Sequence, residues 1–231
     1  MGWIWTEILM RYILPLGGTT GCALLAAMVL SAAACPPAWA DGEGTIIDDW
    51  DSVPVPPPPE LSDVSVSAAR TALLILDVQN RNCNAERRPR CVASLPRIMR
   101  LLEECRSQSL PVVYTLTSNA SPEDIREEVR PRADEPVVAS GVDKFYGTDL
   151  EQILRGRGIE TVVLVGTSAH GAVLNTATGA ALRGLEVIVP IDGMSASEPW
   201  AEQYTAWHLA NSPGTRNRVR LTTISRVSVG P

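Results

Sequence analysis

Among the 20 lysine and arginine residues of this 231-residue chain, only Lys144 is a lysine, and the chain has only two histidines. The formal net charge is −6, and the basic residues gather only in a short patch around Arg87, Arg88 and Arg90, which we interpret as a solvated loop. A chain with neither positive net charge nor an extended basic stripe is not expected to bind nucleic acid.

Several catalytic signatures are also missing. The sequence has no G-x-S-x-G elbow, which argues against an ordinary serine hydrolase. It has no G-x-G-x-x-G motif and no phosphate-binding loop. We therefore predict no nucleotide cofactor, and no cofactor of any other kind.

The first forty residues have the pattern of a secretory signal peptide. Arg11 precedes a run of apolar and small residues from Gly17 to Ala34, and Ala38-Trp39-Ala40 then forms a small-x-small cleavage site. Uncleaved membrane anchoring, or lipid attachment at Cys35, are the alternatives, but the run is short and rich in Gly, Thr and Ala. We predict a signal peptide over residues 1–40, a periplasmic or secreted protein, and no stable membrane insertion after cleavage.

The cysteines outside that segment fit an exported protein. Cys83 and Cys91 bracket a short polar loop, and in an oxidising compartment they can form a disulfide. Zinc binding is the alternative, but no second cysteine pair lies nearby, and we predict no metal. Cys105 lies in an amphipathic helical pattern and is interpreted as a core thiol.

The remainder of the chain divides into an arm, residues 41–66, and a domain, residues 67–231. The arm is acidic and then proline-rich over Asp41–Pro59, a composition that we take to exclude a helix or a central strand. In the domain, apolar runs alternate with helical patterns, which predicts an α/β fold with a mostly parallel sheet and helices on both faces. The expected strands are Thr71–Asp77, Pro111–Leu116, Thr161–Gly166, Glu186–Asp192 and Val219–Ile224, and the expected helices are Leu95–Ser107, Asp149–Arg157, Gly171–Arg183 and Pro199–Ala210.

Ligands of such sheets bind outside the carboxyl ends of the strands, and two strand ends here are polar. Asp77 ends a buried apolar run and is followed closely by Asn80. It is either an acid or base in a cleft, or a helix cap or structural ion pair. The small residues Thr167 to Ala172 join a strand to a helix, an arrangement that suits an oxyanion but also tight helix packing.

Three blocks of the chain together resemble the isochorismatase-like hydrolases, a family that includes nicotinamidases and other cysteine hydrolases. They are TALLILDVQN, KFYGTDLEQILRGRGIETVVLVGT and SAHGAVLNTATGAALRGLEVIVPIDGMSA, and they cover about Thr71 to Ala196. The resemblance implies a three-layer αβα fold around a parallel sheet. It also implies an active site with an aspartate after the first strand, a lysine, and a cysteine at the start of a helix.

Asp77 matches the family's aspartate, but the other two positions depart from the pattern. The cysteine position falls on Ala172, which removes the thiolate route to an acyl-enzyme. The lysine position falls on Ala139, and Lys144 lies five residues later in the same segment. As the only lysine, Lys144 is our candidate for the second catalytic residue, because a long side chain can reach the cleft from a different starting point.

The pair Ala169-His170 resembles the isochorismatase branch of the family, in which the cysteine is also absent. That branch adds water across a vinyl ether with the aspartate as acid, so the resemblance implies a raised pKa for Asp77. It also implies a cis peptide near Thr167-Ser168. We assign substrate or oxyanion binding to Asn80, Ser168, Ala169, His170 and Gly171. Metal-binding relatives use an Asp/His/His set, whereas the only histidines here, His170 and His208, lie far apart in the sequence.

Three functions remain open from the sequence. The first is an exported hydrolase acting on a small-molecule amide, ester or vinyl ether, with Asp77 as acid or base and Lys144 stabilising developing charge. The second is a non-catalytic small-molecule binder, which explains Ala139 and Ala172 with no further assumption. The third is an assembly role in which the proline-rich arm docks on a partner. Trp200, Tyr204 and Trp207 could provide the interface of a homo-oligomer.

Overall fold

The computed structural model describes residues 44–230, which divide into two compact units with a boundary in the sequence between Pro54 and Val55. The predicted signal peptide lies outside the described residues. In the first unit, one helical turn, α1 (Ile46–Asp49), contradicts the expectation that no helix forms between Asp41 and Pro59. The cause is local, because the N-cap Thr45 receives a reciprocal capping interaction from Asp48, whose Oδ2 accepts the Thr45 N–H at 2.8 Å.

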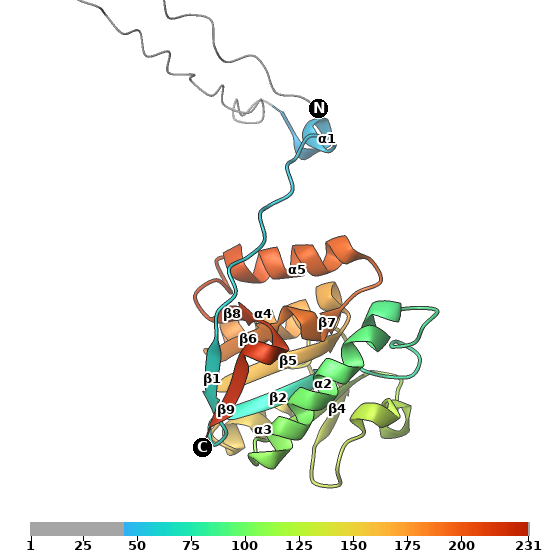
Figure 1. Ribbon diagram of the computed structural model, residues 1–231, viewed down its shortest axis with the longest axis vertical. Coiled ribbons are helices and arrows are strands. Elements are labelled where there is room, and N and C mark those ends of the chain that lie inside the picture. Colours follow the sequence, from blue (N-terminus) through green and yellow to red (C-terminus); the bar gives the residue numbers. More distant parts are fainter. Residues whose placement is uncertain (1–43, 231) are drawn as a thin grey trace, which may run out of the picture. The chain divides into compact units, whose positions relative to one another are not determined.

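The second unit is a sheet of parallel strands with helices on both faces (Figure 1). The strands of the main sheet lie in the order β4-β3-β2-β5-β6-β8, and the short β7 pairs with the end of β5. Their bounds are β2 Thr71–Leu76, β3 Val112–Thr117, β4 Val137–Ser140, β5 Thr161–Thr167, β6 Glu186–Pro190, β7 Met194–Ser195 and β8 Val219–Thr222. A separate two-stranded ladder pairs β1 (Val64–Ser67) with β9 (Val227–Gly230). The predicted α/β fold class is confirmed.

Alternate residues of the central strand β2 face two hydrophobic cores. Leu73 and Ile75 pack in the core that contains α2 (Pro89–Ser107) and the β1–β9 ladder. Leu74 and Leu76 pack in the core formed with α3 (Leu150–Gly156), α4 (Leu174–Leu182) and α5 (Pro199–Asn211). Burial of β2 on both faces explains why its sequence is a continuous apolar run.

Shorter helical segments connect these elements. They are the 3-10 turns Pro122–Asp124, Glu127–Val129, Ile191–Gly193 and Ile224–Arg226, and the π-helical turn Ala169–Val173 that leads into α4. None of the helices in residues 44–230 is long and apolar enough to cross a membrane.

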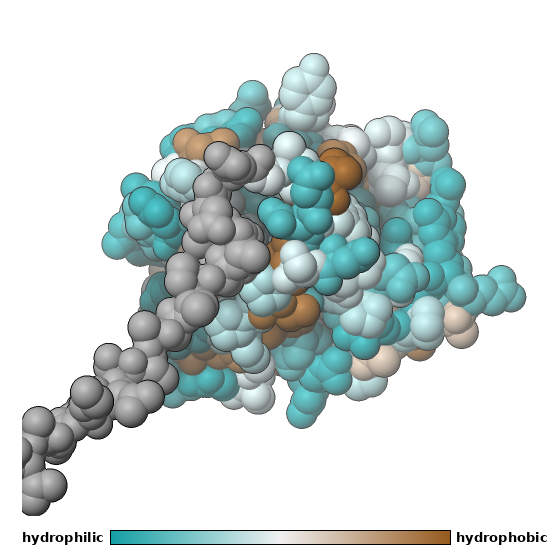
Figure 2. Space-filling model, turned by 90° about the horizontal axis from the view of Figure 1, so that it is seen from above, coloured by the Kyte–Doolittle hydropathy of each residue, from teal (hydrophilic) through white to brown (hydrophobic). Residues whose placement is uncertain are grey.

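The largest exposed aromatic side chains of the second unit include three on α5. Trp200 is 64% exposed, and Tyr204 and Trp207 are each 43% exposed. The proline-rich stretch Val55–Pro59 and α5 line a common cavity of about 560 Å³, so this part of the arm lies near the helix. The face seen in Figure 2 is otherwise mostly hydrophilic, with hydrophobic residues in small separate patches.

Candidate active site

The order of the strands changes direction between β2 and β5. From β2 the sheet continues through β3 to β4, whereas from β5 it continues through β6 to β8. Leu76 lies opposite Gly166, so Asp77 after β2 and Thr167 at the end of β5 are neighbours. Ligands of open α/β sheets bind at this kind of switch point, and Asp77 is the carboxylate that the fold places there.

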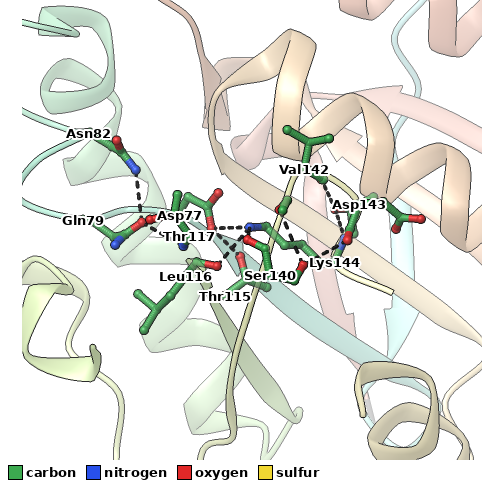
Figure 3. Close-up of polar contacts among 12 residues, drawn as sticks. Asp77, Gln79, Asn82, Thr115, Leu116, Thr117, Ser140, Val142, Asp143 and Lys144 are labelled. Atoms are coloured by element: carbon green, nitrogen blue, oxygen red, sulfur yellow. Dashed lines mark hydrogen bonds and ion pairs between the residues drawn. The ribbon is translucent and has the colours of Figure 1, made fainter. Parts of the chain in front are cut away.

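The carboxylate of Asp77 is held by one of its two oxygens. Oδ1 lies 2.9 Å from the Lys144 ammonium nitrogen and accepts a hydrogen bond of 2.9 Å from the Thr115 hydroxyl on β3 (Figure 3). Oδ2 has no hydrogen-bond partner among residues 44–230. The backbone of Asp77 has a φ of 52°, a conformation that aspartate tolerates better than most residues and that ends the strand here.

The side chain of Lys144 is completely buried. Its ammonium group donates to the backbone oxygens of Leu116 at 3.1 Å and Ser140 at 3.3 Å, in addition to the contact with Asp77. Three acceptors match the three N–H donors of an ammonium group, so no donor is left for a ligand. Lys144 therefore acts on the carboxylate of Asp77 and on the ends of β3 and β4.

The turn after β4 places Lys144. The Ser140 hydroxyl donates to the Asp143 carbonyl at 3.0 Å, and the Asp143 carboxylate accepts the Phe145 N–H at 3.0 Å. The Lys144 N–H donates to the Thr176 hydroxyl on α4 at 3.3 Å. From this position the Lys144 side chain reaches Asp77 and the ends of β3 and β4, although Lys144 lies five residues beyond Ala139. Ala139 itself is exposed on β4.

Burial is the dominant influence on the ionisation of Asp77. Desolvation raises the pKa of the Asp77 carboxyl above its usual value, because the charged form loses hydration. The positive charge and hydrogen bond of Lys144, the Thr115 hydroxyl and the more distant Arg88 oppose that rise without cancelling it. A carboxyl group with a raised pKa can carry a proton closer to neutral pH, which is what a general acid needs.

A pocket of about 350 Å³ opens beside Asp77. The ends of β2, β3 and β4 and the loop between β2 and α2 form its walls. Its lining residues are Asp77, Arg81, Asn82, Arg87, Thr117, Ser118, Asn119, Ser140, Gly141 and Val142. Asp77 is the only acidic residue in this lining.

The turn after β5 offers no nucleophilic side chain at the family's cysteine position. The peptide Thr167-Ser168 is cis, as the resemblance implied, and the π-helical turn Ala169–Val173 follows it. Ala172 is buried and presents a methyl group. Gly171 lies so close to Ser168 that an added Cβ would be 2.5 Å from the Ser168 hydroxyl oxygen.

The structure brings Asp77 and Lys144 together, but none of the predicted binding residues lines the pocket beside Asp77. Ser168, Ala169, His170 and Gly171 do not line the pocket beside Asp77; Ala169 is fully buried and His170 is exposed. Asn80 is exposed and lines a different pocket, of about 510 Å³, with residues of the 3-10 turns Pro122–Asp124 and Glu127–Val129. Substrate binding by these five residues stays a prediction.

Several residues of the site were not predicted from the sequence. Thr115 lies inside an apolar strand pattern, and only the pairing of β3 with β2 shows that its hydroxyl reaches Asp77. Gln79 is fully buried, and its Oε1 accepts from the Thr117 N–H at 3.2 Å and from Asn82 at 3.0 Å. Gln79 lies two residues after Asp77 in the TALLILDVQN block, and this position could have identified it as a residue of the site.

Cys83 and Cys91 form a disulfide at the start of α2, and Cys105 is a buried free thiol. Burial raises the pKa of the Cys105 thiol to about 12, so this residue is not a thiolate nucleophile. Within residues 44–230, no group of three or more histidine, cysteine or acidic side chains is placed to hold a metal ion.

Comparison with known families identifies the domain. The isochorismatase domain matches residues 71–218. The secreted isochorismatase effector Isc1 of Verticillium dahliae is 31% identical over 142 residues, which are 56% of this chain and 75% of the relative.

Solved structures show the same fold. An isochorismatase-like hydrolase from Alkaliphilus metalliredigens superposes with a TM-score of 0.62 at 24% identity, over 68% of this chain and 96% of that protein. The N-carbamoylsarcosine amidase of Thermoplasma acidophilum gives a TM-score of 0.59 at 26% identity, over 67% of this chain and 96% of that protein.

Proposed function

Since this chain belongs to the isochorismatase family, we propose that it is an exported hydrolase that uses Asp77 as acid and base, without a cysteine nucleophile. Its substrate is a small-molecule amide, ester or vinyl ether. The observation that carries the proposal is the asymmetry of the Asp77 carboxylate: Oδ1 is held by Lys144 and Thr115, while Asp77 lines an open pocket and Oδ2 is unpaired within residues 44–230.

Hydrolysis of a vinyl ether suits this arrangement best, since it needs no covalent intermediate with the protein. Protonated Asp77 gives its proton to the terminal vinyl carbon, and the ether oxygen stabilises the resulting cation. Water then adds to the cationic carbon and returns a proton to the carboxylate. The hemiketal that forms breaks its C–O bond and yields a carbonyl compound and an alcohol. One carboxyl group serves both proton transfers.

In this proposal Lys144 is a positioning residue. Its three donors are directed at Asp77 and at two backbone carbonyls, so it contributes by holding Oδ1 and by limiting the rise of the Asp77 pKa. Lys144 would then keep the pKa of Asp77 in a range in which the carboxyl group can both give and accept a proton.

Turnover by the purified protein tests the proposal, with a panel of small vinyl ethers, esters and amides as substrates. Asp77→Asn preserves the size of the side chain but removes its proton transfer, and we expect kcat/KM to fall by about 10²–10⁴. Asp134→Asn, at an exposed position outside the pocket, is the matched control and should retain activity. Equal activity of Asp77→Asn and the control would overturn the proposal.

A non-catalytic small-molecule binder is the second candidate, and it is favoured by Ala139 and Ala172, which replace the family's lysine and cysteine positions. It predicts that no substrate of the panel turns over, whereas a small ligand raises the melting temperature of the wild-type protein but not of Asp77→Asn.

Export is supported by three observations. The sequence carries a signal-peptide pattern, Cys83 and Cys91 form a disulfide, and the relative Isc1 is described as secreted.

A further inference from the structure

The loop between β2 and α2 contributes two arginines to the pocket beside Asp77. Arg81 and Arg87 both line the pocket and are exposed. Neither guanidinium group makes an ion pair or hydrogen bond within residues 44–230. Other surface arginines, such as Arg100, also lack partners. Arg81 and Arg87 differ from them because both charges lie at one pocket.

The charge of the pocket favours an anion. Asp77 is the only acidic lining residue, and its charge is balanced by Lys144 at 2.9 Å. Arg81 and Arg87 are therefore uncompensated, although the whole chain has a net charge of −6. The rest of the lining is uncharged, and Asn82, Ser118 and Asn119 provide further polar groups. An anionic ligand would pair with charges that are otherwise left to solvent.

Arg88, next in the sequence, adds to this field. It is half-buried, its Nε is buried without a hydrogen-bond partner, and its charge is felt at both Asp77 and Arg87. Burial lowers the pKa of the Arg88 guanidinium, but an arginine remains charged at neutral pH. The loop thus carries three positive charges, Arg81, Arg87 and Arg88, and its one acidic residue besides Asp77, Glu86, does not line the pocket.

The loop is held in place before any ligand binds. The disulfide between Cys83 and Cys91 closes the segment that carries Arg87, and Arg126 donates to the Cys83 carbonyl at 2.8 Å. Arg81 precedes this segment, in a turn where the Cys83 N–H donates to the Gln79 carbonyl at 2.8 Å. Within the loop, the Asn84 carboxamide oxygen accepts the Arg87 N–H at 2.8 Å. A backbone fixed in this way loses little further freedom on binding, which reduces the entropic cost of bringing two arginines to one anion.

We propose that Arg81 and Arg87 form an anion-binding subsite that selects substrates with a carboxylate or phosphate group at the end remote from the reacting bond. The subsite sits on the loop between β2 and α2, and the turn that follows β4 contributes Gly141 and Val142 to the same pocket. The role of the subsite in catalysis rests on the proposed function, since Asp77 would act on the other end of the same substrate. Anion binding itself does not depend on turnover.

Calorimetric titration of the full-length protein with benzoate, phenyl phosphate and the neutral isostere benzamide tests the subsite. We expect one of the two anions to bind at least about tenfold more tightly than benzamide, and to lose affinity in about 0.5 M NaCl. The double variant Arg81→Gln/Arg87→Gln should lose about tenfold or more of that affinity. Arg100→Gln, an exposed control outside the pocket, should bind as the wild type does.

The outcomes separate the subsite from the proposed function. Benzamide binding as tightly as both anions, no binding of either anion, or unchanged anion affinity in the double variant would overturn the subsite. Asp77-dependent turnover can survive that result. Conversely, if anions bind through the two arginines but no substrate turns over, the subsite stands and the hydrolase proposal fails. With a turned-over anionic substrate, the double variant should raise KM and leave kcat nearly unchanged.

Discussion

The side chain of Lys144 has no exposed surface, and all three N–H donors of its ammonium group are used. Removing one partner of a buried ion pair leaves the other charge without compensation, and this is far more costly than removing both. The pair of Asp77 and Lys144 therefore makes a specific prediction about stability.

We expect Lys144→Met to lower the free energy of unfolding by about 3–5 kcal/mol at about pH 8 and by less at about pH 5. Without Lys144 the pKa of Asp77 rises further, since Lys144 is the largest influence that lowers it. When the pKa of a carboxyl group is higher in the folded than in the unfolded state, the folded protein loses stability as the pH rises through the folded value. Urea unfolding at both pH values measures the difference.

The double variant Asp77→Asn/Lys144→Met is the control for this effect. It removes both charges, so its stability should be less dependent on pH than that of Lys144→Met. If Lys144→Met is equally stable at both pH values, the two side chains are not coupled in solution as the structure indicates.

At the residue level, the sequence pointed to Asp77 and Lys144 for different reasons. Asp77 follows from the family block, and Lys144 follows from being the only lysine in the segment where the family has one. Thr115, Arg81 and Arg87 could not be predicted in this way. Their relation to Asp77 depends on strand pairing and on the path of a loop, which residue spacing does not reveal.

At the level of elements, the loop between β2 and α2 depends on its disulfide. The two cysteines are 8 residues apart, and closing a loop of this length stabilises a fold by roughly 2–3 kcal/mol in the chain-entropy description. We expect the variant Cys83→Ser/Cys91→Ser to be less stable by about this amount in denaturant unfolding.

Reductant provides the matched control for the disulfide. It should destabilise the wild-type protein to a similar extent and leave the double serine variant unchanged, because Cys105 is not part of a disulfide. Equal unfolding midpoints for the oxidised wild type and the variant would contradict a stabilising role for this loop closure.

The elements that the sequence predicted well are those with long apolar runs. Strands β2, β3, β5, β6 and β8 were expected within one or two residues. Burial on both faces keeps these strands largely apolar, with the exception of β8, where Arg220 is exposed. By contrast, β4 and the β1–β9 ladder were not expected, because each of these short strands mixes buried with more exposed positions and has no long apolar run. The start of α2 at Pro89 was missed by six residues, since Arg and Pro dominate its first turn.

At the level of the whole molecule, we predict that removal of residues 1–40 leaves the arm and the domain as the mature protein. We expect the mature protein, recovered from a secreting host, to begin at Asp41, because Ala38 and Ala40 provide the small side chains that precede a cleavage site. N-terminal sequencing measures this directly. Ala40→Glu should block cleavage, and a wild-type protein that keeps its first forty residues would contradict the prediction.

The dependence of kcat/KM on pH, for wild type and Asp77→Asn, tests the central claim most directly. If Asp77 is the acid, kcat/KM of the wild type should fall as the pH rises through its pKa, which burial places above the usual aspartate value. Asp77→Asn should be slower by about 10²–10⁴ and lack that limb of the profile. A wild-type profile that is shared by Asp77→Asn at similar rates would show that another group carries the reaction.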